Sequence, residues 1–293
     1  MWGIVFFGVA SGILLDVLVG LLGSRRNIGF GWAFLASVFL TPFVGLIITL
    51  LSDQLPAGAE PKVEVSDDGY LMLEKLDDIL NERTRIVAVT HISNVLGIIN
   101  PIADIIRICH SKGVPVLIDG AQGIVHCNVD MQDLDCDFYV FSGHKMYAAT
   151  GTGVLYGKKK WLDAMPPYMG GGEMVGTVTF AETTYAPLPM KFEAGTQNFA
   201  SAATLKQAID FINLLNDNEL IEYNDKIRDY LLDYFQKDER IRLFGVPRGT
   251  SHEKIPLFSF VVDGVHHEDL ALILDKMGIA VRSGQMCAEP VMD

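Results

Sequence analysis

Two stretches decide the fold of this chain: Val114–Gln122, which reads VPVLIDGAQ, and Phe138–Lys145, which reads FYVFSGHK. Each begins with a continuous apolar run of strand length and then turns polar, at Asp119 in the first and at Ser142 in the second. Continuous apolar runs are typical of strands that are covered on both faces, as in parallel sheets. Because ligands bind beyond the carboxyl ends of such strands, we expect a ligand site at Asp119 and along Ser142–Lys145.

The neighbouring segments alternate between helix and strand patterns. Leu71–Leu80 has apolar residues at helical spacing, and Arg85–Thr90 is a β-branched run of strand length. A second helix is expected to start after Asn100 and to stop at Gly113. Its apolar face would consist of Ile102, Ile105, Ile106 and Cys109. This alternation predicts an α/β fold built on a largely parallel sheet.

Composition excludes some classes of function. The formal net charge is −13, and the only run of three basic residues is Lys158–Lys160, so we expect no binding of nucleic acid. The four cysteines form no CxxC pair, which predicts neither a zinc site nor a disulfide framework. A length of 293 residues is sufficient for two domains.

The N-terminal part is much more apolar than the rest of the chain. Trp2–Leu22 and Trp32–Leu51 are each about 20 residues long, the length at which a helix crosses a bilayer. We expect a transmembrane hairpin over residues 1–52 rather than a cleaved signal peptide, because no basic segment precedes the first run. The hairpin turn carries Arg25 and Arg26, which by the positive-inside rule would lie in the cytoplasm and place the rest of the chain outside.

Asp119 and Lys145 together suggest the cofactor pyridoxal phosphate (PLP). This cofactor needs a lysine amine that binds it covalently and a carboxylate that keeps its pyridine nitrogen protonated. Taken alone, an aspartate at a strand end is more often a turn or helix cap, and a lysine after a histidine is more often a surface residue. The glycine-bearing context strengthens the pair, since DGAQ at 119–122 and FSGHK at 141–145 are followed by GTG at 151–153 and an expected strand, Val154–Tyr156.

In this order the motifs resemble the class V aminotransferase and cysteine desulfurase family of fold-type-I PLP enzymes. Four further segments look like the SUF-type desulfurase branch: His91–Gly97, Asp135–Tyr139, Phe192–Asn198 and Gly278–Ala288. The resemblance covers residues 62–293. It implies a PLP-binding large domain with a mainly parallel sheet over 62–215 and a small α+β domain over 216–293. The segment 53–61, with its prolines, glycine and acidic residues, is expected to be the linker that leaves the membrane.

The resemblance also implies a role for each matching residue. Lys145 would hold PLP as a Schiff base and move the Cα proton of the substrate, and Asp119 would pair with the pyridine nitrogen. The remaining cofactor contacts would come from Asn94 and Gln122 at the ring oxygen, and from Ser142, His144 and, across the interface of a homodimer, Thr196 at the phosphate.

Cys287 matches the family's nucleophile, which takes sulfur from L-cysteine as a persulfide and leaves L-alanine. Since the thiolate is the attacking form, we expect Cys287 in a partly exposed, cationic setting to which Arg282 contributes, beside the substrate. The sulfur would pass to an acceptor protein for iron–sulfur cluster assembly. A selenocysteine lyase, acting on L-selenocysteine, shares every motif quoted above and remains an alternative.

Two departures from the family lead to a third hypothesis. The family has a long stretch before the part that matches Lys62, and it continues beyond the counterpart of Asp293 with an arginine that grips the substrate carboxylate. On this comparison both domains are expected to be partial, so the alternative is an inactive, membrane-tethered fragment from a fusion or a gene-model join. A desulfurase domain is expected in the cytoplasm, opposite to the side that Arg25 and Arg26 indicate.

Overall fold

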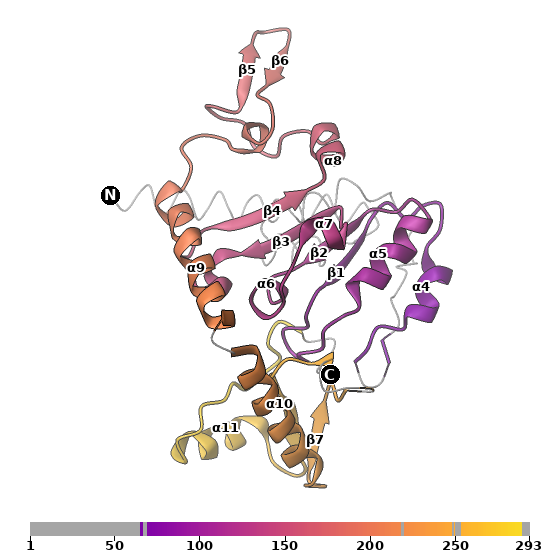
Figure 1. Cartoon of the computed structure of the whole chain (residues 1–293), viewed down its shortest axis with the longest axis vertical. Helices are drawn as coiled ribbons and strands as arrows, with labels where there is room; N and C mark the ends of the chain where they lie inside the picture. Colours follow the sequence, from indigo (N-terminus) through magenta and orange to yellow (C-terminus); the bar gives the residue numbers. More distant parts are fainter. Residues whose placement is uncertain (1–64, 67–68, 218–219, 248, 250–252, 289–293) are drawn as a thin grey trace.

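The computed structural model describes residues 65–66, 69–217, 220–247, 249 and 253–288. In this part a four-stranded sheet lies at the centre, the β5–β6 hairpin projects at one end, and α10, α11 and β7 gather at the other (Figure 1). The predicted transmembrane hairpin and the linker, residues 1–61, lie outside the described residues. Within those that are described, no helix combines the length and the apolar character needed to cross a bilayer.

The central sheet has the strand order β1-β2-β3-β4. Its strands are β1 (Val87–Thr90), β2 (Val116–Asp119), β3 (Phe138–Ser142) and β4 (Gly153–Gly157). The first three are parallel, as predicted, with Thr90 opposite Asp119, whereas β4 runs antiparallel to β3. The reversal follows from the connection, because residues 143–152 contain only the short 3-10 helix η1 (Gly143–Met146) and form no crossover helix. The prediction of a parallel sheet therefore holds for three of the strands.

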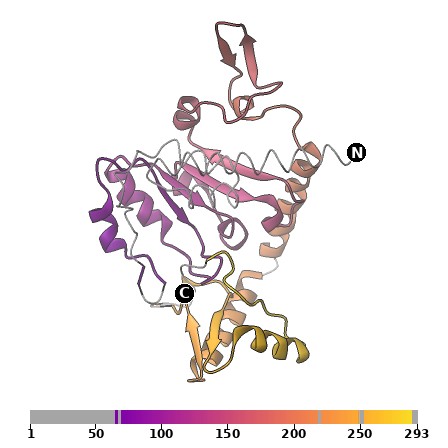
Figure 2. The same cartoon turned by 180° about the vertical axis from the view of Figure 1, so that it is seen from behind.

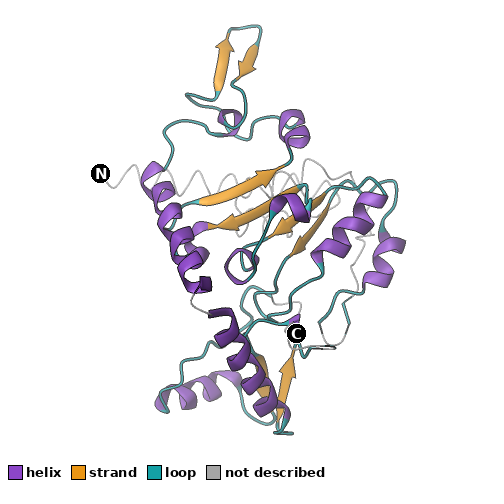
Figure 3. Cartoon of the chain, in the orientation of Figure 1, coloured by secondary structure: helices purple, strands orange, loops and turns teal. Residues whose placement is uncertain are grey.

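One face of the sheet is covered by four helices, of which one precedes β1, one follows β1 and two follow β2. Figure 3 shows the strands flanked by helices. These elements are α4 (Leu73–Ile79), α5 (Ile102–Ser111), α6 (Gly123–His126) and α7 (Met131–Leu134). The predicted apolar face of α5 is buried against Val116, Ile118 and Tyr139. Each buried isoleucine contributes about 1.5–3 kcal/mol. The helix ends where Gly113 takes a φ of 71°, which glycine adopts without strain.

The opposite face of the sheet packs on α8 (Lys159–Ala164). Leu117, Phe138 and Val140 form its buried cluster, and Trp161 and Leu162 of α8 lie against them. Because side chains alternate along a strand, Leu117 and Ile118 face opposite layers, so β2 is covered on both sides as its apolar sequence predicted.

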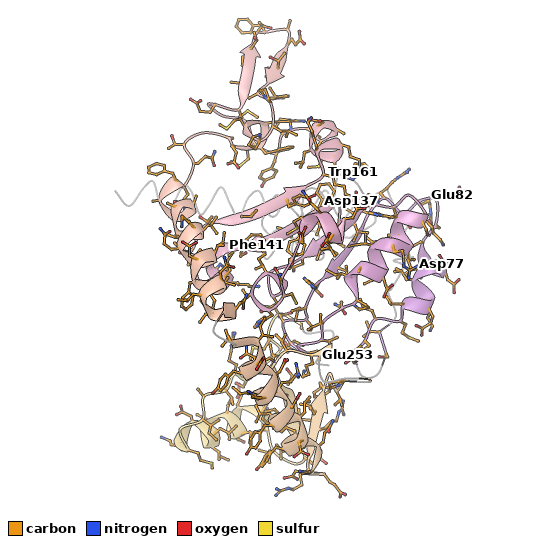
Figure 4. All side chains as sticks on the ribbon, in the orientation of Figure 1. Asp77, Glu82, Asp137, Phe141, Trp161 and Glu253 are labelled. Carbon is orange, nitrogen blue, oxygen red and sulfur yellow. The ribbon has the colours of Figure 1, made fainter. Side chains whose placement is uncertain are left out.

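Asp137 joins the two layers at the beginning of β3. Its side chain is 1% exposed, and it accepts hydrogen bonds from His110 Nε2 of α5 at 2.7 Å, from Val116 N at 2.9 Å and from Trp161 Nε1 of α8 at 2.6 Å. Figure 4 shows Asp137 and Trp161 next to each other. Burial alone would raise the pKa of Asp137, but these hydrogen bonds and the charge of Lys158 lower it, so the carboxylate is ionised.

The rest of the described chain continues beyond the central sheet. These elements are β5 (Val175–Val178), β6 (Thr183–Tyr185), the 3-10 helix η2 (Met190–Phe192), α9 (Phe199–Asp217), α10 (Leu220–Gln236), β7 (Ile241–Phe244), β8 (Ser259–Val262) and α11 (His267–Lys276). Figures 1 and 2, from opposite sides, show that the β5–β6 hairpin stands away from the other elements. Phe235 of α10 packs on Phe258 and Phe260 with ring centroids 5.5 and 5.0 Å apart. The predicted domain division between 62–215 and 216–293 stays a prediction.

Candidate active site

The three parallel strands end at one edge of the sheet, and polar residues follow each of them. β1 ends before His91, β2 ends on Asp119, and β3 ends on Ser142, which is followed by η1 with Lys145. The main chain ties two of these ends together, since His91 N donates to the Asp119 carbonyl at 2.8 Å. The edge is therefore the meeting point that the sequence predicted for Asp119 and Ser142–Lys145.

Asp119 presents a carboxylate with one occupied and one available oxygen. Its Oδ1 accepts a hydrogen bond from Ala121 N at 2.9 Å, while no donor of the described residues reaches its Oδ2. Burial raises the pKa of Asp119, and the Ala121 amide and the charge of Lys145 oppose that rise. Lys145 therefore lies within electrostatic range of Asp119, although the two side chains form no ion pair.

Lys145 offers an amine without a bonding partner. It is exposed on η1, and it makes no hydrogen bond or ion pair with any residue that the structure describes. The segment is held by the main chain, because Gly143 N donates to the Thr152 carbonyl at 2.7 Å. A Cβ on Gly143 would lie 3.0 Å from that carbonyl oxygen, which explains the glycine of the FSGHK motif. An amine without a partner among the described residues and a carboxylate thus lie at the same edge of the sheet.

His91 is a buried member of the site to which the sequence assigned no role. Its side chain is 8% exposed, and its Nδ1 lies 3.0 Å from the Tyr139 hydroxyl. The turn after β2 rests on these two rings: a Cβ on Gly123 would come within 2.2 Å of His91 Nδ1, and one on Gly120 within 1.8 Å of Tyr139 Cε1. The sequence did contain a signal for this residue, because His91 directly follows β1, whose last residue lies opposite Asp119.

Burial lowers the pKa of His91 from 6.5 to about 4, so its imidazole is neutral in the folded chain at pH 7. The unfolded chain binds a proton on this residue at pH values below 6.5, but the folded chain does so only below about 4. His91 therefore stabilises the fold fully above pH 6.5, and this contribution is lost as the pH falls toward 4. Between pH 7 and pH 5 we expect a loss of about 2 kcal/mol in the free energy of unfolding that His91→Asn does not show.

Urea unfolding of both proteins at the two pH values measures this difference. Asparagine places a polar atom near the position of Nδ1 and has no titrating group, so it is the matched variant. An equal pH dependence in the wild type and in His91→Asn would contradict the buried, neutral histidine.

Cys287 lies on a turn that is tied to the loop after β1. The turn is closed by a hydrogen bond from Ala288 N to the Gln285 carbonyl at 2.8 Å, and the Cys287 side chain is exposed. Asn94 Nδ2 donates to the Met286 carbonyl at 2.9 Å. Because the loop of Asn94 begins at His91, this contact brings the Cys287 turn to the same edge as Asp119.

The other predicted site residues make no direct contacts with one another within the described part of the chain. Gln122 is the N-terminal cap residue of α6, and His144 is exposed on η1 beside Lys145. Thr196 and Arg282 are exposed, and neither hydrogen bonds to another predicted site residue in the described ranges. The segment of Thr196 approaches the start of β4, since Asn198 Nδ2 donates to the Gly151 carbonyl at 3.4 Å.

This donor set fits a cofactor that carries a basic ring nitrogen and an electrophilic carbonyl carbon. The available oxygen of Asp119 suits the nitrogen, and the free amine of Lys145 suits the carbon. Thr152, whose carbonyl binds Gly143 N, also has a buried Oγ1 without a hydrogen-bond partner among the described residues. Asp119 Oδ2 and Lys145 Nζ therefore remain available to a ligand, since the two groups do not form a structural ion pair with each other.

Comparison with known proteins gives one consistent family. The class-V aminotransferase model matches residues 57–293. A cysteine desulfurase of Cronobacter sakazakii is 45% identical over 238 residues, which are 80% of this chain and 57% of the relative. A probable cysteine desulfurase of Vibrio cholerae is 46% identical over 232 residues, 79% of this chain and 56% of the relative. This chain therefore spans just over half the length of these relatives.

Solved structures agree with these sequences. The cysteine desulfurase CsdA of Escherichia coli superposes with a TM-score of 0.70 and 38% identity, over 78% of this chain and 56% of that one. The apo cysteine desulfurase of Thermococcus onnurineus superposes with a TM-score of 0.72 and 32% identity, over 78% of this chain and 57% of that one.

Proposed function

This chain belongs to the class-V aminotransferase family, and we propose that it is a PLP-dependent cysteine desulfurase that converts L-cysteine to L-alanine and takes the sulfur on Cys287. One observation carries the proposal: Asp119 and Lys145, which has no hydrogen bond or ion pair with the described residues, lie at the same sheet edge, to which Asn94 ties the turn of Cys287. The identity of 45% to a cysteine desulfurase supports the same activity.

The residues at the edge would each bind a different part of PLP. Lys145 Nζ would bind the cofactor covalently, and Asp119 Oδ2 would accept a hydrogen bond from its ring nitrogen. The bound cofactor supplies an electron-accepting ring that makes the Cβ–S bond of the substrate labile. The ring oxygen and the phosphate would be bound by the residues that the sequence analysis named: Asn94, Gln122, Ser142, His144 and Thr196.

The chain's own groups then move one proton and one sulfur atom. Lys145 Nζ takes the proton from Cα of L-cysteine. Cys287 Sγ, as a thiolate, attacks the substrate sulfur, so that an S–S bond forms while the Cβ–S bond breaks and its electron pair stays on carbon. A proton from solvent on Cβ completes the methyl group of L-alanine, and Lys145 returns the proton to Cα. The sulfur remains on Cys287 as a persulfide, so atoms and charge balance.

The other three cysteines are unsuited to this step. Burial raises the pKa of Cys109 and of Cys136 to about 11 and also raises the pKa of the half-buried Cys127, so these three are thiols at pH 7. Cys287 is the exposed cysteine of the described chain. An exposed persulfide can also be passed to an acceptor protein, which we propose as the partner in iron–sulfur cluster assembly.

Replacing Cys287 by serine is expected to lower the release of alanine and sulfide from L-cysteine at least about a hundredfold, because serine does not accept the sulfur. The measurement is turnover by the full 293-residue chain with added PLP. Cys127→Ser is the matched control and is expected to keep wild-type turnover. The absence of turnover in the wild type would overturn the proposal and favour the inactive fragment, while much faster turnover of L-selenocysteine would favour the selenocysteine lyase.

We also propose that the chain acts as a homodimer. The β5–β6 hairpin carries exposed Val178, Phe180 and Tyr185 away from the rest of the described chain, and α9 exposes Phe199 and Leu214. Exposed apolar groups of this kind mark interaction surfaces. Sedimentation at the mass of one chain would contradict the dimer, and with it the reach of Thr196 into a second site.

A further inference from the structure

The turn that carries Cys287 has an unfavourable backbone conformation. Both of its central residues lie in the left-handed region, Met286 with a φ of 49° and Cys287 with a φ of 64°. With the hydrogen bond from Ala288 N to the Gln285 carbonyl, this is the pattern of a type I′ turn. Such positions favour glycine, asparagine and aspartate, so a methionine followed by a cysteine needs support from elsewhere.

The loop after β1 supplies that support on both sides of Cys287. Asn94 Nδ2 donates to the Met286 carbonyl at 2.9 Å, across 192 positions of sequence. The side chains of Met286 and Ala288 pack on a buried cluster of that loop, which consists of Val95, Leu96 and Ile98. The thiol between these two anchored residues is left exposed.

The loop after β1 is itself held in place by several hydrogen bonds. Its backbone is closed by a hydrogen bond from Ser93 N to the Ile98 carbonyl at 2.9 Å. Ser259 Oγ donates to the Val95 carbonyl at 2.5 Å, and the buried Lys254 donates to the Leu96 carbonyl. The loop starts at His91, whose amide binds the Asp119 carbonyl. Asn94 therefore connects a rigid extension of the cofactor edge to the turn.

We infer that Asn94 is a positioning residue for Cys287: its amide group holds the Met286 carbonyl and thereby keeps the strained turn in the conformation that presents the thiol to the substrate. The inference rests on the proposed function for the role of the Cys287 thiol. The hydrogen bond between Asn94 and the Met286 carbonyl does not depend on that function. It adds a role to the contact with the ring oxygen that the family resemblance implies. Asn94 Oδ1 and the second amide hydrogen remain available for that contact.

The test is trypsin cleavage after Arg282, an exposed residue just before the turn. Asn94→Asp keeps the shape of the side chain but replaces the donor by an acceptor that faces the Met286 carbonyl. We expect cleavage after Arg282 to become about fivefold faster, the factor that corresponds to the loss of one hydrogen bond. Asn81→Asp, which makes the same change at an exposed site after α4, is the matched control and is expected to have no effect.

Cleavage after Lys160 in α8, which packs on the central sheet, is a second site in the same chain and is expected to stay unchanged. Cys287→Gly removes the strain without removing a buried contact, because glycine adopts positive φ freely and the cysteine side chain is exposed. We therefore expect Cys287→Gly to slow the cleavage after Arg282 and to return the rate of Asn94→Asp toward the wild-type value.

Unchanged cleavage after Arg282 in Asn94→Asp would overturn the inference, and so would an equal acceleration after Lys160, which indicates general destabilisation. Should Asn94→Asp fail to fold, Cys287→Gly alone decides, since faster cleavage in it would show that the turn is not strained. None of these rates needs turnover, so a failure of the proposed function would leave this result readable. In an active chain, Asn94→Asp is also expected to slow persulfide formation about fivefold at saturating L-cysteine.

Discussion

Lys145→Ala is expected to remove the visible absorption of protein-bound PLP and to lower sulfide release from L-cysteine at least about a thousandfold. Two functions are lost at once, the covalent hold on the cofactor and the group that moves the Cα proton, and general acid–base catalysis alone contributes about a hundred- to ten-thousandfold. The removal of the Lys145 charge is also expected to raise the pKa of Asp119 further, because that charge lowers it in the wild type.

Absorption spectra of the full chain with added PLP, recorded beside turnover, measure this effect. Lys206→Ala is the matched control, since Lys206 is an exposed lysine of α9 whose ion pair in the described chain is with Asp210 on its own helix. The same band in the wild type and in Lys145→Ala would show that PLP is bound elsewhere and would contradict the site.

Asp137→Asn is expected to lower the free energy of unfolding by about 3–5 kcal/mol, which is a large part of the stability of an ordinary domain. The carboxylate is 1% exposed and accepts hydrogen bonds from α5, from the start of β2 and from α8. An amide nitrogen in place of one oxygen would face a donor, leaving buried polar groups unsatisfied. We expect the substitution to lower the free energy of unfolding without changing the sheet edge at Asp119, because Asp137 lies at the opposite end of the strands.

Urea unfolding of Asp137→Asn beside Asp133→Asn measures this loss. Asp133 is exposed in the first turn of α7, so the same chemical change at that position is expected to cost little. A stability within about 1 kcal/mol of the wild type for Asp137→Asn would mean that the three hydrogen bonds do not hold the layers together.

The sequence predicted the elements whose pattern is local. The helix over Ile102–Ser111 followed from apolar residues that recur at its own period, and the strand before Asp119 from a continuous apolar run. The placement of Asp119 and Lys145 at one edge of the sheet followed from one rule, that parallel strands end at the same edge. The direction of β4 was not predicted, because a strand pattern reads the same in either direction and only the connection distinguishes the two.

The contacts that position the site had no local signal. Asn94 and Met286 are 192 positions apart, and His91 and Tyr139 are 48 apart, so their pairing arises only from the packing of the whole chain. Asp137 appeared in the sequence merely as part of a motif beside Cys136. Its role in joining α5 to α8 depends on which helices cover which face, and no spacing in the sequence specifies that.

The measurement that tests the central claim most directly is mass spectrometry of the Cys287 peptide after the full chain, loaded with PLP, has reacted with L-cysteine. The account predicts one additional sulfur atom on Cys287, none on the half-buried Cys127, and none on Cys287 in Lys145→Ala. Alanine released while Cys287 stays unmodified, or a Cys287 persulfide that forms equally well without Lys145, would contradict it.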